Sequence, residues 1–181
     1  MQVAETERDD AETISLAAWT LFRLAGEAAM AAAAVDRALA LNPNAALAWL
    51  ARRSIHAVRN QPEAAIEALE RARRLSPFDP YTFVFGSNMA LAHLAARRFE
   101  QAIEWADRAL SDQPRMVAAM RVKVVAFAHL GHLDEARAEL SRLLAIDPKL
   151  TIARHREFLH VVAPEVLELV VTGLRLAGLP E

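Results

Sequence analysis

The chain has 181 residues, enough for one domain of ordinary size with a substantial core. Hydrophobic residues make up 54% of it, many of them alanine, and aromatic residues make up only 6%, a composition that predicts an all-α protein. The formal net charge of −2 excludes a strong overall attraction to nucleic acid or anionic lipid, and the lack of cysteine excludes disulfides and thiolate chemistry.

The N-terminal residues 1–11 are polar and acidic, and they lack the apolar core of a signal peptide. We expect this segment to be flexible. No stretch of about 18 uncharged apolar residues occurs, so we expect no membrane insertion. A soluble, cytoplasmic protein is the resulting expectation.

Hydrophobic periodicity and turn residues predict about ten helices, arranged in antiparallel pairs, and no strand. Gly26 and Gly131 are natural helix stops between the two helices of a pair. Asn60 and Arg97 occupy the same turn position in the other two pairs. The backbone conformation of this turn should be less favourable for arginine than for glycine, which takes positive φ without strain. The expected helices are, in chain order, 15–24, 27–41, 46–58, 62–75, 81–96, 99–110, 117–130, 133–146, 151–160 and 164–176.

A template recurs along these pairs. Four prolines stand 34, 37 and 34 residues apart, and small residues recur twelve and five positions before them, with Leu143 as the one enlargement. Small side chains at fixed offsets let the two helix axes of a pair approach closely. The structural positions of the template are Ala31, Ala38, Pro43, Trp49, Ala65, Ala72, Pro77, Ala102, Ala109, Pro114, Gly131, Ala136 and Pro148.

A period near 34 with these offsets resembles the tetratricopeptide repeat (TPR) family over about residues 12–148. Trp49 matches the large aromatic residue of that family. The resemblance implies an all-α, right-handed superhelix (an α-solenoid) of four helix pairs, closed by a C-terminal capping pair. The implied units are 12–45, 46–79, 80–116 and 117–149, followed by the capping helices at 150–181.

A finer resemblance is carried by four strings of residues. They are similar to the C-terminal repeat region of bacterial class III adenylate/guanylate cyclases, and similar tails follow winged-helix DNA-binding domains. The chain itself offers no metal-binding aspartate pair on a strand, so cyclase catalysis is not implied. The strings are Ala40–Asn44, Arg74–Tyr81, Ala90–Leu94 and Gly173–Glu181.

The six histidines do not form a convincing metal site. His129 and His132 are separated by the helix stop Gly131, and His155 and His160 are five residues apart, a spacing that does not share a helical face. No nucleophile motif or glycine-rich phosphate loop is present. We therefore expect no enzyme, catalytic residue, cofactor or metal, and we interpret the arginine clusters as solvated faces rather than nucleic-acid sites.

The resemblance places the concave groove of the superhelix on the first helix of each pair. A mixed, largely apolar lining would suit an amphipathic helix or an extended peptide. The positions of the family's lysine/asparagine carboxylate clamp hold Leu16, Thr20, Leu50, Ser54, Ser87 and Leu91 here, which disfavours that activity. The expected groove residues are Leu16, Thr20, Arg23, Leu50, Ser54, Ser87, Leu91, Leu94, Arg121, Val125 and His129.

Three functions remain open at this point. The first is a non-catalytic scaffold that binds a protein or peptide partner in the groove, unless the end helices fold over part of it. The second is a regulatory tail of a cyclase-like or winged-helix signalling protein. The third is a self-association module, forming a homodimer through the apolar flank around residues 28–35.

Overall fold

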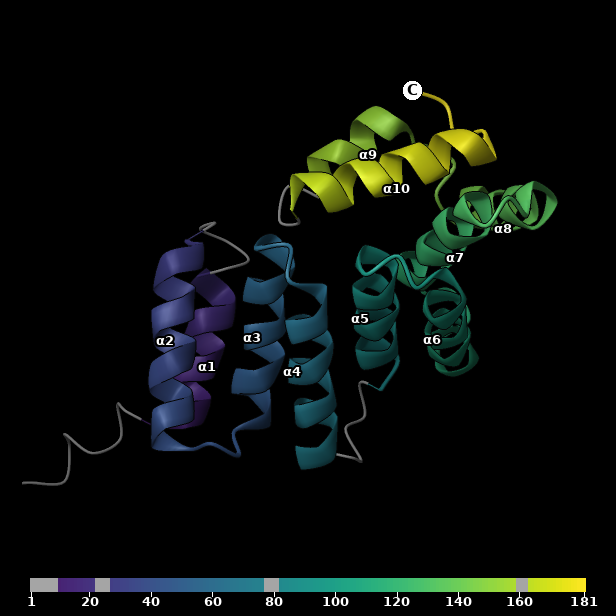
Figure 1. Ribbon diagram of the computed structural model, residues 1–181. Helices are drawn as coiled ribbons and strands as arrows, with labels where there is room; N and C mark the ends of the chain where they lie inside the picture. Colours follow the sequence, from purple (N-terminus) through teal and green to yellow (C-terminus); the bar gives the residue numbers. More distant parts are fainter. Residues whose placement is uncertain (1–9, 22–26, 77–81, 159–162) are drawn as a thin grey trace, which may run out of the picture. The chain divides into compact units, whose positions relative to one another are not determined.

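The computed structural model describes residues 10–21, 27–76, 82–158 and 163–181 (Figure 1). Within these ranges the chain forms ten helices and no strand, as the sequence predicted. The helices are α1 (Ala11–Thr20), α2 (Ala28–Leu41), α3 (Ala46–Val58), α4 (Pro62–Leu75), α5 (Thr82–Ala95), α6 (Phe99–Asp112), α7 (Val117–His129), α8 (Leu133–Ile146), α9 (Ile152–Phe158) and α10 (Pro164–Ala177).

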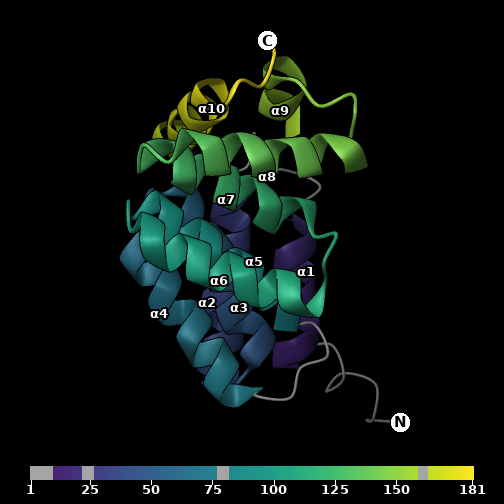
Figure 2. The same ribbon diagram turned by 90° about the vertical axis from the view of Figure 1, so that its right-hand side faces the viewer.

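The chain divides into two compact units, Met1–Pro77 and Phe78–Glu181. In the first unit α1 packs on α2 and α3 on α4, and the two pairs are joined through α2–α3 and α1–α3 contacts. In the second unit α5 packs on α6 and α7 on α8, and α10 packs on α7, α8 and α9 (Figure 2). Each unit therefore contains two helix hairpins, and the second also carries the C-terminal helices.

The first helix begins earlier than the sequence predicted. Asp10 caps it, because its carboxylate accepts hydrogen bonds from the Thr13 backbone N–H at 2.6 Å and from the Thr13 hydroxyl at 2.7 Å. These bonds also lower the pKa of Asp10. The described helix α1 therefore begins at Ala11 instead of residue 15 and covers Ala11–Thr20. The predicted helix end at residues 22–24 and the expected stop at Gly26 lie outside the described residues.

The turns inside three helix pairs adopt left-handed backbone geometry at equivalent positions. The φ angles are 53° at Asn60, 57° at Arg97 and 82° at Gly131. Glycine takes this geometry freely and asparagine tolerates it, whereas an arginine there places its Cβ close to the following carbonyl oxygen. Arg97 therefore has the unfavourable backbone conformation that the sequence predicted for this position.

The small residues of the repeat template lie inside the helix pairs. The residues twelve positions before each proline are at most 1% exposed, and those five positions before are at most 7% exposed. The close approach is visible between α5 and α6, where a Cβ added to Gly86 would lie 3.2 Å from the Cβ of Ala109. The buried template residues are Ala31, Ala38, Ala65, Ala72, Ala102, Ala109, Ala136 and Leu143.

An ion network connects α6, α7 and α8 within the second unit. Lys123 Nζ lies 2.7 Å from the Asp107 carboxylate and 3.7 Å from the Glu139 carboxylate. Glu139 also pairs with Arg142, whose Nη1 lies 2.9 Å from the carboxylate. The Lys123 and Glu139 side chains are only 13% and 7% exposed. Because charges are costly to bury alone, each member of this network depends on the others.

Helix α10 packs closely on α7, and the start of α9 is bonded to the C-terminal segment. A Cβ added to Gly173 of α10 would lie 2.7 Å from Cγ1 of Val125, so the two helices touch almost backbone to backbone. The His129 ring nitrogen Nε2 is 2.8 Å from the Leu169 carbonyl oxygen, and the Ile152 N–H donates to the Pro180 carbonyl at 2.9 Å. These contacts make α10 part of the unit's core.

Candidate functional site

The first helices of unit 1 present an exposed apolar surface, formed by Leu16 and Trp19 of α1 and Leu47 and Leu50 of α3. Leu16 is 60% exposed, Trp19 43% and Leu47 47%, and Leu50 is half-buried. The helices α1 and α3 contact one another, so these side chains belong to neighbouring elements. We call these four residues the unit 1 apolar surface.

Sequence reasoning named only Leu16 and Leu50 among these four. Trp19 follows Leu16 by three residues on α1, and Leu47 precedes Leu50 by three residues on α3. Residues three apart share a helical face, so the sequence spacing was the signal that could have predicted Trp19 and Leu47. Thr20 lies beside Leu16 and donates a hydrogen bond from its hydroxyl to the Leu16 carbonyl at 2.9 Å. Ser54 is 3% exposed and therefore faces the interior. Arg23 lies outside the described residues.

The expected groove residues of α5 are mostly buried inside unit 2. Ser87 is 6% exposed and Leu94 is 0% exposed, whereas Leu91 is half-buried. Leu91 packs at the edge of the main core of this unit. Of these three positions, Leu91 is the one that a partner could contact.

Two of the three expected groove residues of α7 are in contact with α10. Val125 is fully buried against Gly173 of α10. His129 bonds to the Leu169 carbonyl and stacks on Phe99, with ring centroids 5.2 Å apart. The predicted alternative, that end helices fold over part of the groove, therefore applies to Val125 and His129 of α7, whereas Arg121 is half-buried.

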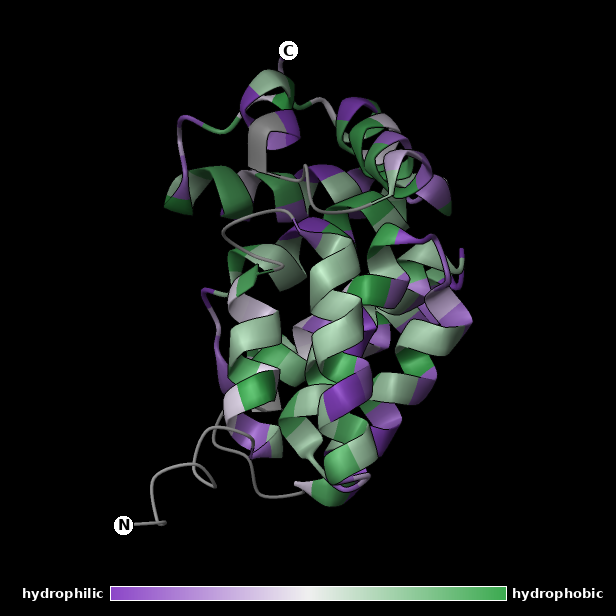
Figure 3. Ribbon diagram, turned by 90° about the vertical axis from the view of Figure 1, so that its left-hand side faces the viewer, coloured by the Kyte–Doolittle hydropathy of each residue, from purple (hydrophilic) through white to green (hydrophobic). Residues whose placement is uncertain are grey.

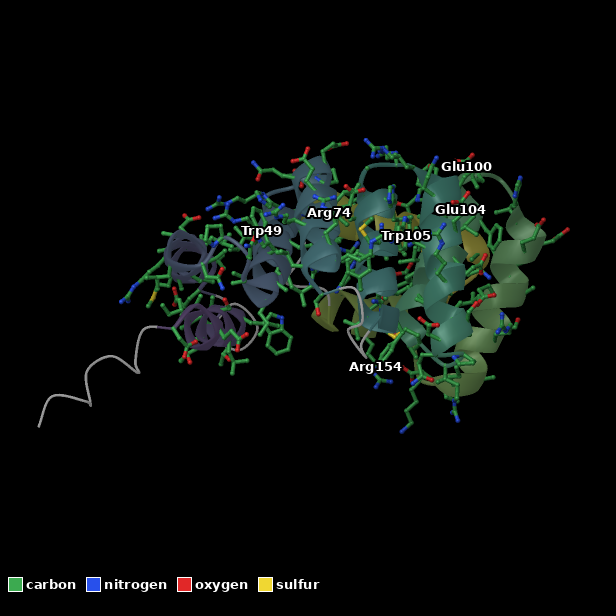
Figure 4. The ribbon with its side chains drawn as sticks, turned by 90° about the horizontal axis from the view of Figure 1, so that it is seen from below. Trp49, Arg74, Glu100, Glu104, Trp105 and Arg154 are labelled. Carbon is green, nitrogen blue, oxygen red and sulfur yellow. The ribbon has the colours of Figure 1, made fainter. Side chains whose placement is uncertain are left out.

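A shallow cavity of about 630 Å³ opens between α3 and α4 in unit 1. Trp49 and Arg74 lie on these two neighbouring helices and line it (Figure 4). The Trp49 indole N–H donates to the Pro43 carbonyl at 2.9 Å, and Arg52 forms an ion pair with Asp36. Because its polar groups bond internally, we interpret this cavity as a feature of repeat packing.

The described part of the chain holds no group of three or more histidine, cysteine, aspartate or glutamate residues arranged for a metal ion. Nor does any helix in these ranges have the length and apolar character that crossing a membrane requires. The arrangement of the described residues is therefore one of surfaces and packed helices, which can bind a partner through apolar contacts.

The sequence profile of the tetratricopeptide repeat family matches residues 17–80 and 87–150, well over half of the chain. The chain belongs to the tetratricopeptide repeat family. It is an all-α protein of the helical-repeat, or solenoid, class, and the buried alanines and repeated prolines described above are the positions of its TPR template.

Curated relatives cover part of the TPR region. An FK506-binding protein-like protein of Homo sapiens is 37% identical over 93 residues, which is 49% of this chain and 27% of the human protein. Its counterpart in Rattus norvegicus is 34% identical over 98 residues, 51% of this chain and 28% of the rat protein. The match thus spans only about a quarter of the length of these relatives.

Solved structures share the TPR fold at low sequence identity. PilF of Pseudomonas aeruginosa has a TM-score of 0.68 and 15% identity, with 93% of this chain and 77% of that chain covered. YrrB, described as a TPR protein with an unusual peptide-binding site, has a TM-score of 0.64 and 19% identity, covering 94% of this chain and 88% of its own. At these identities the likeness concerns the fold alone.

Proposed function

We propose that this TPR protein is a non-catalytic scaffold that binds a peptide or protein segment on the first helices of its repeats. The observation that carries the proposal is the unit 1 apolar surface, where Leu16 and Leu47 are 60% and 47% exposed on adjacent first helices. Burying a leucine side chain fully contributes about 1.5–3 kcal/mol, so a few such contacts support a specific complex. The peptide-binding site of YrrB supports a ligand of the same class.

The partner that suits this surface is a segment with apolar side chains along one side. Leu16 and Trp19 are three residues apart on α1, and Leu47 and Leu50 are three apart on α3, so each helix offers a short apolar strip. An amphipathic helix with apolar residues at i, i+3 and i+4, or an extended peptide, can cover both strips.

The test is a selection of peptides from a phage-displayed library on the full chain, followed by fluorescence anisotropy with the selected peptides. Leu50→Glu and Leu16→Glu should each weaken binding by at least tenfold, because a carboxylate would be placed in the apolar contact. Leu41→Glu is the matched control, since Leu41 is a 54% exposed leucine at the end of α2, a second helix. Equal losses in all three variants would contradict the proposal.

A regulatory tail of a cyclase-like or winged-helix protein is a second proposal. It is supported by the resemblance of the strings Arg74–Tyr81 and Gly173–Glu181 to the repeat region of those proteins. The genomic reading frame around the coding sequence tests it directly. An in-frame cyclase or DNA-binding domain would support a tail, and a reading frame of the TPR region alone would reject it.

Self-association is a third proposal, supported by an exposed apolar strip on α2. Met30 is 57% exposed, and Ala29 and Ala33 are exposed on the same helix. Figure 3 faces α1 and α2 and shows hydrophobic residues along these helices. Sedimentation equilibrium should give a dimer whose mass falls to that of one chain in Ala29→Glu or Ala33→Glu. A single-chain mass at all concentrations would reject a homodimer.

A further inference from the structure

The unit 1 apolar surface has a negative charge at the end where its helices begin. Glu12 stands four residues before Leu16 and seven before Trp19 on α1, so the three side chains share one helical face. Glu12 is exposed, and its side chain forms no ion pair or hydrogen bond with any other residue that the structure describes. The carboxylate is therefore available to a group that approaches this surface.

The helices α1 and α3 run in the same direction, and this gives the surface two distinct ends (Figure 1). Ala11, at the start of α1, lies in one core cluster with Ala48, near the start of α3. Ala18, near the end of α1, lies in a second cluster with Ile55, near the end of α3. Glu12 is therefore level with the first turn of α3.

The opposite end of the surface carries a positive charge. Arg53 follows Leu50 by three residues on α3, on the same helical face, and is half-buried. It comes after the first turn of α3 by about 10 Å along the helix axis, at 1.5 Å for each residue. The surface therefore presents its leucine and tryptophan side chains between a carboxylate at one end and a guanidinium at the other.

These charges distinguish the two directions in which a segment can lie on the surface. Apolar contacts alone discriminate poorly between them, because the hydrophobic effect is non-directional. Charged groups beside an apolar contact fix the register of a complex and disfavour wrong arrangements. A basic side chain of the partner would approach Glu12 in one direction and Arg53 in the other. The first arrangement pairs opposite charges, whereas the second brings like charges together.

We propose that the segment bound on the unit 1 apolar surface carries a lysine or arginine that pairs with Glu12, and that this pair sets the direction of the segment. The pairing depends on the proposed peptide-binding function, because the apolar contacts bring the segment to the surface. Glu12 lies about one helical turn from Leu16, so the basic residue should stand about one turn from the apolar residues of a helical partner. The aliphatic stem of a lysine or arginine can cover apolar surface while its charged head reaches the carboxylate.

The expected effect on affinity is modest, because Glu12 is exposed. An exposed ion pair changes a binding constant by about two- to fivefold. In Glu12→Lys the attraction is replaced by repulsion, so a peptide with the basic residue should bind about tenfold more weakly.

The first experiment lets the surface select the charge of its partner. A phage-displayed peptide library, with leucine fixed at i, i+3 and i+4 and the flanking positions randomised, is panned on the full chain and on Glu12→Lys. Lysine and arginine should be enriched at one flanking turn on the wild type, and aspartate and glutamate at the same turn on Glu12→Lys. The same flanking residues on both proteins would overturn the proposal.

Glu100→Lys is the matched control for this selection. Glu100 is an exposed acid at the second position of α6, as Glu12 is at the second position of α1 (Figure 4). Both substitutions remove an acid from the first turn of a helix, so they should lower the Tm by similar amounts. Glu100→Lys should select the same flanking residues as the wild type.

A double-mutant cycle then measures the pair itself. A selected peptide, with its basic residue kept or replaced by glutamine, is titrated against the wild type and Glu12→Gln by fluorescence anisotropy. Loss of the basic residue should weaken binding to the wild type about two- to fivefold and leave binding to Glu12→Gln unchanged. The difference should disappear in about 1 M salt, where the Debye length is about 3 Å. Equal losses on both proteins would show that the basic residue does not pair with Glu12.

Paramagnetic broadening in NMR spectra tests the direction of the bound peptide. A nitroxide is placed on the end of the selected peptide that carries the basic residue. It should broaden the backbone amide signal of Thr13, which follows Glu12, more than that of Ser54, which follows Arg53. Equal broadening of the two signals, or the reverse order, would overturn the direction set by Glu12.

The charge pair and the peptide scaffold fail in different ways. Binding that is lost in Leu16→Glu and Leu50→Glu but unchanged in Glu12→Lys would retain the scaffold and reject only the pair. A library that yields no peptide dependent on the two leucines would reject both. A peptide affinity that falls as the chain concentration rises would assign the surface to a second copy of the chain and overturn the proposal.

Discussion

The approach of α10 to α7 can be tested by adding one methyl group. In Gly173→Ala the new Cβ would lie 2.7 Å from Val125 Cγ1, 3.1 Å from its Cβ and 3.0 Å from its backbone Cα. Optimal carbon–carbon separations are about 3.5–4.0 Å. Because one of the crowded atoms belongs to the backbone and Val125 is fully buried, a rotamer change cannot relieve the overlap, and α10 must move away from α7.

The expected magnitude is the difference between two opposing effects. Overpacking a well-filled core costs about 1–3 kcal/mol. Alanine is better than glycine in a helix interior by about 1 kcal/mol. The net loss in the free energy of unfolding should therefore be about 1 kcal/mol and can reach about 2 kcal/mol.

The same substitution in α5 provides the control. In Gly86→Ala the nearest atoms are the Ala109 Cβ at 3.2 Å and the Ala109 backbone at 3.4 Å, so the neighbour needs to yield only a few tenths of an ångström. The gain in helix propensity should then offset the steric cost, and the stability should change by less than about 0.5 kcal/mol.

Urea unfolding followed by circular dichroism measures both variants. A rescue variant combines Gly173→Ala with Val125→Ala, which removes the Cγ1 methyl group that the new Cβ would meet first. Because the two changes share one contact, the double variant should lose less stability than the sum of the losses of the two single variants. If Gly173→Ala is as stable as Gly86→Ala, the close docking of α10 on α7 is wrong.

Three further predictions concern a strained turn, the ion network and the buried histidine. Arg97→Gly should stabilise the protein by about 0.5–1 kcal/mol, seen as a higher Tm, because relief of the left-handed strain exceeds the added chain entropy, and Asn60→Gly should gain less. Lys123→Met should destabilise it by about 3 kcal/mol in urea, because Glu139 is left buried with one fewer cation, whereas Lys123→Met combined with Glu139→Leu should recover most of the loss. Burial lowers the pKa of His155 to about 4 in the folded protein, whereas the unfolded value is about 6.5. The neutral imidazole therefore contributes its full share to the free energy of unfolding above pH 6.5, and this share is lost as the pH falls toward 4. Between pH 7 and pH 5 the loss should be about 1–2 kcal/mol after allowance for screening, and His155→Gln should abolish this part of the pH dependence; an equal slope in wild type and variant would contradict it.

The sequence alone determined the helix pairs of this protein. Two helix axes can approach closely only where the side chains between them are small, as at Ala65 and Ala102. Both alanines stand twelve residues before a proline, which cannot continue the helix. The turn at Asn60 could also be predicted from the local sequence, because few residue types accept a positive φ. Such features depend on residues near one another in the chain, so periodicity reports them.

Only the tertiary structure decided which face of α7 is covered. Whether Val125 lines an open surface or a core depends on Gly173, 48 residues later, and no repeat period connects the two. This contact arises because α10 buries its apolar residues on α7. The choice of that partner is made by the three-dimensional fit of the side chains, which leaves no local signal in the sequence.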